Sequence, residues 1–441
     1  MGDFNQPESK EDFLNNFQEV KPLMNSTEAL YESARCLFCY DAPCITACPT
    51  EIDIPLFIRQ INTNNITGAS NTIYRSNWLG NICGQVCPTE VLCEGACVYN
   101  HQNVKPIEIG RLQSYATAQA IKSGQKLKKD AKKLNQSVAV VGAGPAGLSA
   151  ACELSNIGYD VTILEARSMP SGLALHGVAP YKITNEQVLA EVEYLKQQFG
   201  FTIEYNHPIA NSRDMAYLDD QFQAIFLGIG LGATRSLKLP GENLHGNWGA
   251  VEFIETLKIS QHQLKVPQRV VVLGGGNTAM DAASECARMG AKQVILAYRK
   301  GLDQMGAYRF EYEMAKNAGV QSLWFVNPLE ILGSERVEAV KFKKTRLEND
   351  KLAILDEEYT VPCDMVIRAT GQSKQVNVFS LVEGIQYESD GGMSQGKLPF
   401  QTTNPKYFVA GDAFNGGLEV VNAVAEAKKA AVSIHQYLQD L

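Results

Sequence analysis

The 441-residue sequence lacks any run of about 18 apolar residues, so we expect no membrane-spanning helix. It also lacks an excess of positive charge, because 40 Lys and Arg stand against 48 Asp and Glu. The resulting net charge of -8 argues against a nucleic-acid-binding surface. The first residues, MGDFNQPESKEDF, have no apolar core of the signal-peptide type, so we expect a cytoplasmic protein.

Cysteine is scarce over most of the chain and concentrated in one part of it. Eight of the 11 cysteines lie between Cys36 and Cys97, and only Cys152, Cys286 and Cys363 follow. These three stand in apolar segments and are predicted to be buried core residues. In a reducing compartment, a dense group of eight favours metal ligation over disulfide bonding.

The eight cysteines form two groups. The first, Cys36-x2-Cys39-x4-Cys44-x3-Cys48-Pro49, resembles the ferredoxin run, in which three thiolates hold one cubane and the cysteine before proline serves another. The second contains Cys83, Cys87, Cys93 and Cys97. By number alone these residues could supply eight ligands for two [4Fe-4S] clusters, and zinc sites are the alternative.

After a polar connector at 121–136, an apolar strand leads into a glycine-rich turn and an Ala-rich helix. The turn contains Gly142, Gly144, Pro145, Ala146 and Gly147, and Glu165 ends the next strand. This is the dinucleotide-binding fingerprint: the glycines allow the backbone to approach a pyrophosphate at the helix N-terminus, and the acid can accept from a ribose hydroxyl.

A second strand, turn and helix follows at 269–289. Its turn contains Gly274, Gly275, Gly276, Asn277 and Thr278, and the following strand ends in Arg299 and Lys300 without an acid. Cations at that place suit the 2′-phosphate of NADP, but they could equally be solvated charges at a strand end.

Two further turns are candidates for nucleotide contacts, at Gly371 and at Gly411-Asp412, and a long helix is expected from 417 to 438. The predicted fold is an α-helical, ferredoxin-like [4Fe-4S] domain followed by two α/β Rossmann-type dinucleotide-binding domains. We expect the domains at 1–125 (clusters), 137–250 and 381–441 (FAD), and 251–380 (NAD(P)).

Three segments, CLFCYDAPCITACPTEIDIPLFI, NWLGNICGQVCPTEVLCEGACV and PIEIGRLQSYA, resemble the N-terminal region of dihydropyrimidine dehydrogenase. The likeness extends to the C-terminal helix, and the chain lacks an FMN-binding barrel, as does the separate reductase subunit of the bacterial two-subunit enzyme. The resemblance implies that Cys36, Cys39, Cys44 and Cys97 hold one cluster. It implies that Cys48, Cys87, Cys93 and Gln113 hold the other, although the simple count would choose Cys83 and Gln113 alone would pass for a helix-surface residue.

The resemblance also implies FAD contacts at the first glycine turn, Glu165, Leu173 and Lys182, and nicotinamide contacts at the second turn, Arg299 and Lys300. An arginine of the NADPH-using relatives is replaced here by Gly306, which leaves NADH or NADPH open. No side-chain acid is expected to be obligatory for hydride transfer. The implied partner is an FMN-containing subunit acting on uracil or thymine.

Three other functions remain open at this point. One is the small subunit of glutamate synthase, which has a similar organisation, and another is a ferredoxin:NAD(P)H reductase. The third is a non-catalytic electron-transfer scaffold, which would not oxidise a nicotinamide nucleotide.

Overall fold

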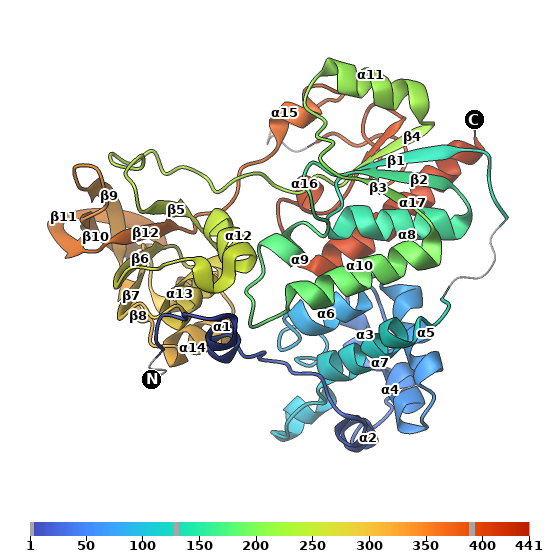
Figure 1. The fold of residues 1–441 in the computed structure, drawn as a ribbon, viewed down its shortest axis with the longest axis horizontal. Coiled ribbons are helices and arrows are strands. Elements are labelled where there is room, and N and C mark those ends of the chain that lie inside the picture. Colours follow the sequence, from blue (N-terminus) through green and yellow to red (C-terminus); the bar gives the residue numbers. More distant parts are fainter. Residues whose placement is uncertain (1–3, 128–131, 388–392, 441) are drawn as a thin grey trace. The chain divides into compact units, whose positions relative to one another are not determined.

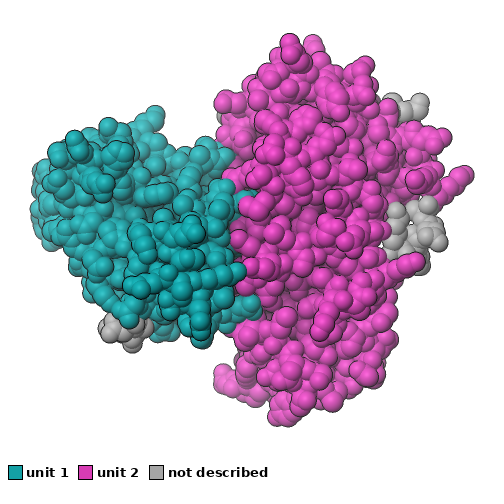
Figure 2. Space-filling view, in the orientation of Figure 1, with its two compact units in different colours: residues 1–19, 176–181, 232–373 teal, residues 20–175, 182–231, 374–441 magenta. Residues whose placement is uncertain are grey.

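The computed structural model describes residues 4–127, 132–387 and 393–440. It comprises two compact units, shown in Figure 2. Unit 1 contains residues 1–19, 176–181 and 232–373, and unit 2 contains 20–175, 182–231 and 374–441. Each unit is described by itself below. No helix in the described ranges is both long and apolar enough to cross a bilayer.

The part of unit 2 from residue 20 to residue 127 is built from helices alone, as the sequence predicted (Figure 1). These are α2 (Ser26–Ala34), α3 (Pro43–Thr46), α4 (Ile54–Asn62), α5 (Ile66–Ser76), α6 (Gly80–Val86), the 3-10 helix η1 (Val98–Gln102) and α7 (Ile109–Ser123). Of the expected polar connector, residues 128–131 lie outside the described residues.

Helix α4 shows why these short segments fold. The Asp53 side chain accepts a hydrogen bond of 3.1 Å from the backbone N–H of Leu56, which caps the helix N-terminus. Four buried side chains then recur at helical spacing on one face: Ile54, Phe57, Ile58 and Ile61. The helix packs against α2, α5 and α7, so burial of its apolar face supplies the stability that such a short helix lacks alone.

The rest of unit 2 centres on a five-stranded parallel sheet with the order β13-β4-β1-β2-β3. The strands are β1 (Ser137–Val141), β2 (Asp160–Leu164), β3 (Thr202–Glu204), β4 (Ala224–Leu227) and β13 (Tyr407–Val409). Because β13 pairs with β4, the C-terminal segment completes a sheet whose other strands all precede unit 1's main segment in the chain.

Several helices accompany this sheet: α8 (Pro145–Ile157), α9 (Leu173–His176), α10 (Asn185–Phe199), α11 (Ser212–Gln221), α15 (Val376–Phe379), α16 (Asp412–Asn415) and α17 (Val420–Gln439). The long predicted C-terminal helix is α17, and it packs along α8. Helix α10 contacts both α8 and α6, so it joins the sheet to the helical region. Figure 1 shows α8, α10 and α17 together between β1 and α6.

Unit 1 contains the second parallel sheet, with the order β5-β12-β6-β7-β8. Its strands are β5 (Asn247–Gly249), β6 (Arg269–Leu273), β7 (Gln293–Tyr298), β8 (Gln321–Trp324) and β12 (Met365–Arg368). The other elements are α12 (Ala250–Ser260), η2 (Gln261–Gln263), α13 (Asn277–Arg288), η3 (Leu302–Gln304) and α14 (Arg309–Asn317), with an antiparallel sheet of β9 (Val326–Leu332), β10 (Ala339–Glu348) and β11 (Lys351–Pro362).

The unit boundaries differ from the expected domain boundaries in several places, one of which is 176–181, a short segment of unit 1 inside the range expected for the FAD domain. Residues 4–19, expected to belong to the cluster domain, pack in unit 1, because α1 (Lys10–Asn16) and the residue after it bring Phe13 and Phe17 into the core around α13. The strand β5 lies in the range expected for the FAD domain, yet it pairs with β12 of unit 1. The main segment of unit 1 therefore begins near 232 and ends near 373, not at 251 and 380.

Candidate functional site

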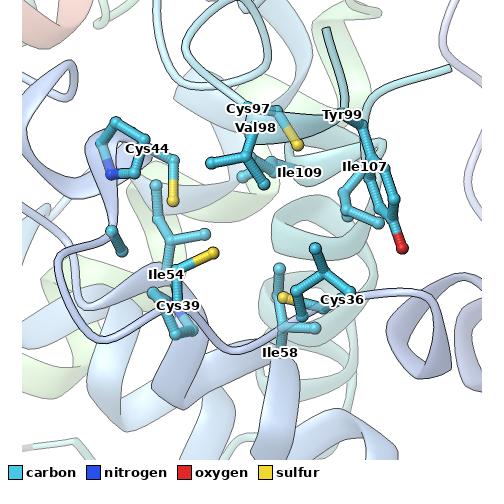
Figure 3. A pocket seen from close by; sticks show the side chains of 14 residues that line it. Cys36, Cys39, Cys44, Ile54, Ile58, Cys97, Val98, Tyr99, Ile107 and Ile109 are labelled. Atoms are coloured by element: carbon cyan, nitrogen blue, oxygen red, sulfur yellow. The ribbon is translucent and has the colours of Figure 1, made fainter. Parts of the chain in front are cut away.

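Four cysteines surround a cavity in the helical region, which we call the first cavity. Cys36 and Cys39 lie in the loop after α2, Cys44 lies in α3, and Cys97 immediately precedes η1. Figure 3 shows their sulfur atoms pointing toward a common centre. The remaining lining is almost entirely apolar: Leu37, Ala42, Pro43, Ile54, Pro55, Ile58, Val98, Tyr99, Ile107 and Ile109.

The apolar lining affects the chemistry of these thiols. Burial raises the pKa of Cys44 to about 12 and also raises the pKa of Cys36. Thiolates are the form that binds metal, so binding iron here releases protons and couples metal loading to the free energy of folding. Within the described ranges, no three Cys, His, Asp or Glu side chains lie close enough together to hold a single metal ion, so the four sulfur atoms face a common space without meeting at one point (Figure 3). Thiols spread around a cavity suit a cluster better than the zinc alternative.

A second cavity holds the other cysteines. Its lining includes Cys48, Cys83, Cys87 and Cys93, together with Gln113 from α7. The other lining residues are Pro49, Ile52, Ile54, Asn77, Gly84, Thr89, Leu92, Gly110 and Val421. The two cavities thus separate the cysteines into the sets that the resemblance implied, with Cys83 as an additional thiol in the second set.

Gln113 is not a surface residue. Its side chain is only 7% exposed, and its Nε2 donates a hydrogen bond of 2.7 Å to the carbonyl oxygen of Gly80. Cys83 is also buried, and its hydrogen bond with Cys87, together with burial, raises the pKa of the Cys87 thiol well above its usual value. The second cavity therefore offers five potential ligands for a cluster that needs four.

The N-terminus of α6, which carries Cys83 and leads to Cys87, is held by a residue that the sequence did not single out. The carboxylate of Glu191 in α10 accepts from the backbone N–H groups of Asn81 at 2.7 Å and Ile82 at 2.8 Å. It also accepts from the Tyr74 hydroxyl at 3.0 Å. Burial raises the pKa of Glu191 to about 7, and these hydrogen bonds oppose that rise. No local motif marks Glu191, since its partners lie far away in the sequence.

The first glycine turn lies where β1 meets α8. Gly142 has a φ of 97°, and a Cβ on Gly147 would lie 1.8 Å from the Gly142 carbonyl oxygen. The position of Gly142 therefore needs a residue that readily adopts a positive φ, and the position of Gly147 needs a residue without a side chain. Glu165, at the end of β2, accepts from the backbone N–H of Ala143 at 2.7 Å and of Arg167 at 2.8 Å. These features fit a pyrophosphate at the N-terminus of α8.

Another turn, which the sequence analysis did not identify, lies against this one. Ser171 adopts a φ of 79° and donates its backbone N–H to the Ala143 carbonyl oxygen at 2.7 Å. This bond brings Gly172 beside Gly144, and Leu173 follows as the first residue of α9. Leu173 is thus anchored close to the glycine turn, while Lys182 lies farther along, before α10. A Ser-Gly pair is the only sequence signal for this turn.

The C-terminal candidate turn also reaches the first glycine turn. A Cβ on Gly411, whose φ is 71°, would lie 2.9 Å from the Cβ of Ala146. The Gly411 N–H donates to Glu426 of α17 at 2.8 Å, which fixes the turn against that helix. Asp412 begins α16, and burial raises the pKa of its carboxyl. Gly411 and Ala146 are therefore neighbours although they lie far apart in the sequence.

The second glycine turn, in unit 1, follows β6. A Cβ on Gly274 would lie 2.4 Å from the Ala369 carbonyl oxygen, and one on Gly275 would lie 2.6 Å from the Tyr298 ring. Gly276 is the N-cap of α13, of which Asn277 and Thr278 are the first residues. Asn277 Oδ1 accepts from the backbone N–H of Tyr308 at 2.9 Å. This arrangement has the backbone geometry of a nucleotide-binding turn.

The remaining candidates of unit 1 lie on two segments. Arg299 and Lys300 follow β7; Arg299 is exposed, and its carbonyl oxygen accepts from Thr345 Oγ1 at 2.7 Å. Gly371 has a φ of 91°, and its carbonyl oxygen accepts from the backbone N–H of Arg235 at 2.9 Å. Its segment pairs with the one that enters unit 1, since the Gly232 N–H donates to the Ser373 carbonyl oxygen at 2.7 Å.

The chain matches two protein families. Residues 13–125 match the family described as dihydropyrimidine dehydrogenase domain II, 4Fe-4S cluster. Residues 90–176 and 136–427 match the pyridine nucleotide-disulphide oxidoreductase family. The chain thus combines an iron–sulfur region with a flavin- and nicotinamide-type oxidoreductase fold.

Individual proteins agree with this assignment. The subunit PreT of the NAD-dependent dihydropyrimidine dehydrogenase of Escherichia coli K12 is 34% identical over 96% of this chain and 98% of its own length. The NADPH glutamate synthase small chain of Halomonas elongata is 32% identical over 96% of this chain and 93% of its own.

Among solved structures, FprA of Mycobacterium tuberculosis in complex with NADPH has a TM-score of 0.58 at 18% identity. The match covers 69% of this chain and 85% of FprA, which supports the fold alone. The matches to PreT and to the glutamate synthase small chain extend over nearly the whole sequence and include both the cysteine region and the two nucleotide turns. The chain belongs to the family of FAD-dependent iron–sulfur oxidoreductases that includes the dihydropyrimidine dehydrogenase subunit PreT and the small chain of glutamate synthase.

Proposed function

We propose that this chain is the reductase subunit of a two-subunit dihydropyrimidine dehydrogenase. It would oxidise a reduced nicotinamide nucleotide and pass electrons through FAD and two [4Fe-4S] clusters to an FMN-containing partner that interconverts uracil or thymine and their 5,6-dihydro forms. The observation that carries the proposal is the second cavity, where three cysteines of the predicted set lie with a buried glutamine.

For the clusters, the proposed ligands are those that line each cavity. Cys36, Cys39, Cys44 and Cys97 would hold the first cluster, since all four line one cavity and few polar groups compete there. The second cluster would be held by the other set: Cys48, Cys87, Cys93 and Gln113. Gln113 Nε2 donates a hydrogen bond to the Gly80 carbonyl oxygen, so the carboxamide oxygen of Gln113 is the atom that would face iron. Cys83 would remain a thiol beside Cys87.

For the flavin, the first glycine turn would hold the pyrophosphate of FAD and Glu165 the ribose. An ionised carboxylate has about four acceptor sites, so the two backbone bonds to Glu165 leave capacity for a ribose hydroxyl. Gly411 and Asp412 would contact the flavin end of FAD. Leu173 and Lys182 would supply further contacts to FAD. FAD, when bound, accepts two electrons as a hydride and releases them one at a time.

For the donor, we favour NADH over NADPH. The second glycine turn would hold the nucleotide, and Gly371 would contribute from the segment that leaves unit 1. Arg299 and Lys300 would supply positive charge near its ribose, but Gly306 provides no third cation. The similar protein PreT is named as a subunit of an NAD-dependent enzyme, which supports the same choice.

The first test is an iron count with a matched pair of variants. Purified protein should be yellow-brown, contain about eight irons per chain, and reduce an artificial acceptor with NADH. Cys87→Ser and Cys83→Ser alter two thiols that line the same cavity and lie close together in the sequence. We expect Cys83→Ser to keep the iron and Cys87→Ser to lose about half of it. Equal losses in both variants would reject the ligand set.

The second test identifies the partner. Glutamate synthase small chains match this chain almost as well as PreT, so the glutamate synthase function is the competing candidate. Alone, the protein should reduce dyes but neither uracil nor 2-oxoglutarate with glutamine. Co-expression with an FMN-barrel subunit should restore uracil reduction. Recovery instead with a large glutamine-cleaving subunit would decide for the alternative, and no dye reduction at all would indicate a scaffold.

A further inference from the structure

Asn77 presents an unusual polar group in the second cavity. Its side chain is fully buried, it lines the cavity with the cysteines, and its Nδ2 has no hydrogen-bond partner among the described residues. A buried N–H donor without an acceptor costs free energy, so such groups in native proteins call for an explanation. Nothing in the cysteine pattern or in the nucleotide turns assigns a role to Asn77.

The orientation of the Asn77 carboxamide is fixed by its surroundings. Its Oδ1 accepts the backbone N–H of Leu79 at 3.0 Å, and its own backbone N–H donates to the Ile73 carbonyl oxygen at 2.9 Å. A backbone N–H requires an acceptor, so the oxygen must face Leu79 and the amide nitrogen must lie on the other side. The donor is therefore held in place by the turn between α5 and α6.

The other polar side chains that line this cavity already have partners. Thr89 Oγ1 accepts from Lys21 Nζ at 2.8 Å, and Gln113 Nε2 donates to Gly80 while its oxygen is the proposed iron ligand. The rest of the lining consists of cysteines, glycines and apolar residues. The sulfur atoms are consequently the side-chain acceptors that remain in this cavity for the Asn77 amide N–H.

We propose that Asn77 Nδ2 donates an N–H···S hydrogen bond to the second iron–sulfur cluster and thereby raises its reduction potential. This inference rests on the proposed function, because it requires a cluster in the second cavity. Reduction adds negative charge to the cluster and its thiolates, and a hydrogen-bond donor stabilises the more negative state. Asn77 would thus act as a positioning and tuning residue without ligating iron.

The test replaces Asn77 by serine, whose hydroxyl can still accept from the Leu79 N–H in a similar turn but is too short to place a donor at the same point. The matched control is Asn81→Ser. Asn81 is a buried asparagine of the same region that does not line the cavity, and its Oδ1 accepts from Thr117. The second cluster is recognised as the one whose EPR signal disappears in Cys93→Ser.

We expect Asn77→Ser to make one-electron reduction of the second cluster less favourable by about tenfold, which is a shift of about 59 mV to more negative potential. Asn81→Ser should leave the potential unchanged, and both variants should keep the wild-type iron content. An unchanged potential in Asn77→Ser with full iron would overturn the inference alone. Wild-type protein with about four irons would instead reject the second cluster, and with it the proposed function.

A second measurement covers the case in which Asn77→Ser does not fold. Wild-type protein is labelled with nitrogen-15 in asparagine side chains only, reduced, and studied by electron–nuclear double resonance at the signal of the second cluster. A nitrogen-15 coupling from an asparagine amide would support the hydrogen bond. A spectrum without any such coupling, from protein with full iron, would overturn it.

Discussion

Gly306 gives the sharpest test of how the nucleotide is selected. The backbone N–H of the following residue, Ala307, donates to the Gly275 carbonyl oxygen at 2.9 Å, which brings Gly306 next to the second glycine turn. A Cβ at Gly306 would meet only that same oxygen, at 3.8 Å, and its φ lies outside the left-handed region. Gly306→Arg should therefore be accommodated without backbone strain and should add a cation beside Arg299 and Lys300.

The magnitude follows from the exposure of the site. A hydrogen bond to a charged group contributes about 1.5–3 kcal/mol when buried, and the exposed Arg299 indicates that solvent screens this region. We therefore expect a gain just below this range, about 1.4 kcal/mol, which is a tenfold rise in the ratio of kcat/KM for NADPH to that for NADH. Higher salt should reduce the gain, because an exposed phosphate–arginine contact is screened.

The assay is dye reduction with each nucleotide separately, using the holoenzyme. Gly306→Gln is the matched control, since glutamine adds a polar side chain without positive charge. The wild type and Gly306→Gln should share one preference and Gly306→Arg should differ from both. A similar shift in both variants would show that the side chain acts through shape, and an unchanged ratio in Gly306→Arg would refute the placement of the ribose beside Gly306.

One further prediction concerns the same nucleotide site, and two concern unit 2. Arg299→Gln should lower kcat/KM for NADPH by several-fold more than for NADH, measured with the same dye; equal losses would assign Arg299 to solvent. Gly147→Ala should lower the free energy of unfolding of the flavin-free protein by about 2 kcal/mol or more. Gly144→Ala should be nearly neutral, because a Cβ at Gly144 meets nothing closer than 3.9 Å. Equal effects of the two substitutions would contradict the close approach at Gly147. For Glu191, the folded pKa of about 7 lies above the ordinary 4.5, so its contribution to stability is complete below pH 4.5 and is lost as the pH rises through 7. Between pH 5 and pH 8, the free energy of unfolding of the wild type should fall by about 3 kcal/mol more than that of Glu191→Gln, which would be seen as a steeper fall in Tm with pH. Parallel curves of Tm against pH for the two proteins would contradict the shifted pKa.

The sequence predicted those parts of the site that depend on neighbouring residues. The glycine turns follow from local steric requirements, since Gly142 needs a positive φ and Gly147 needs to lack a side chain. The grouping of cysteines by cavity followed from spacing and resemblance. The strands of the two parallel sheets and the helices of the region that carries the eight cysteines were predictable for the same reason.

Features that depend on distant contacts were not predictable. The three-residue strand β5 has no periodicity of its own, and only pairing with β12 assigns it to unit 1. Helix α1 looks like a polar N-terminal segment until Phe13 and Phe17 are seen in the core that α12 and α13 help to form. Glu191 carries no motif, and its role exists only because α10 presents it to the uncapped N–H groups of α6.

The contacts of Glu191 help to explain why the helical region and the parallel sheet β13-β4-β1-β2-β3 form one compact unit. Helix α6 has no side-chain cap of its own and carries or precedes two of the thiols of the second cavity. Two of its N-terminal N–H groups are satisfied from α10, which also packs on α8, the helix of the first glycine turn. A cavity that must hold its ligands in fixed positions is thereby tied to the helix that would hold the pyrophosphate. Loosening that tie should disturb cluster retention and flavin retention together, because α10 both carries the carboxylate that holds α6 and packs on α8.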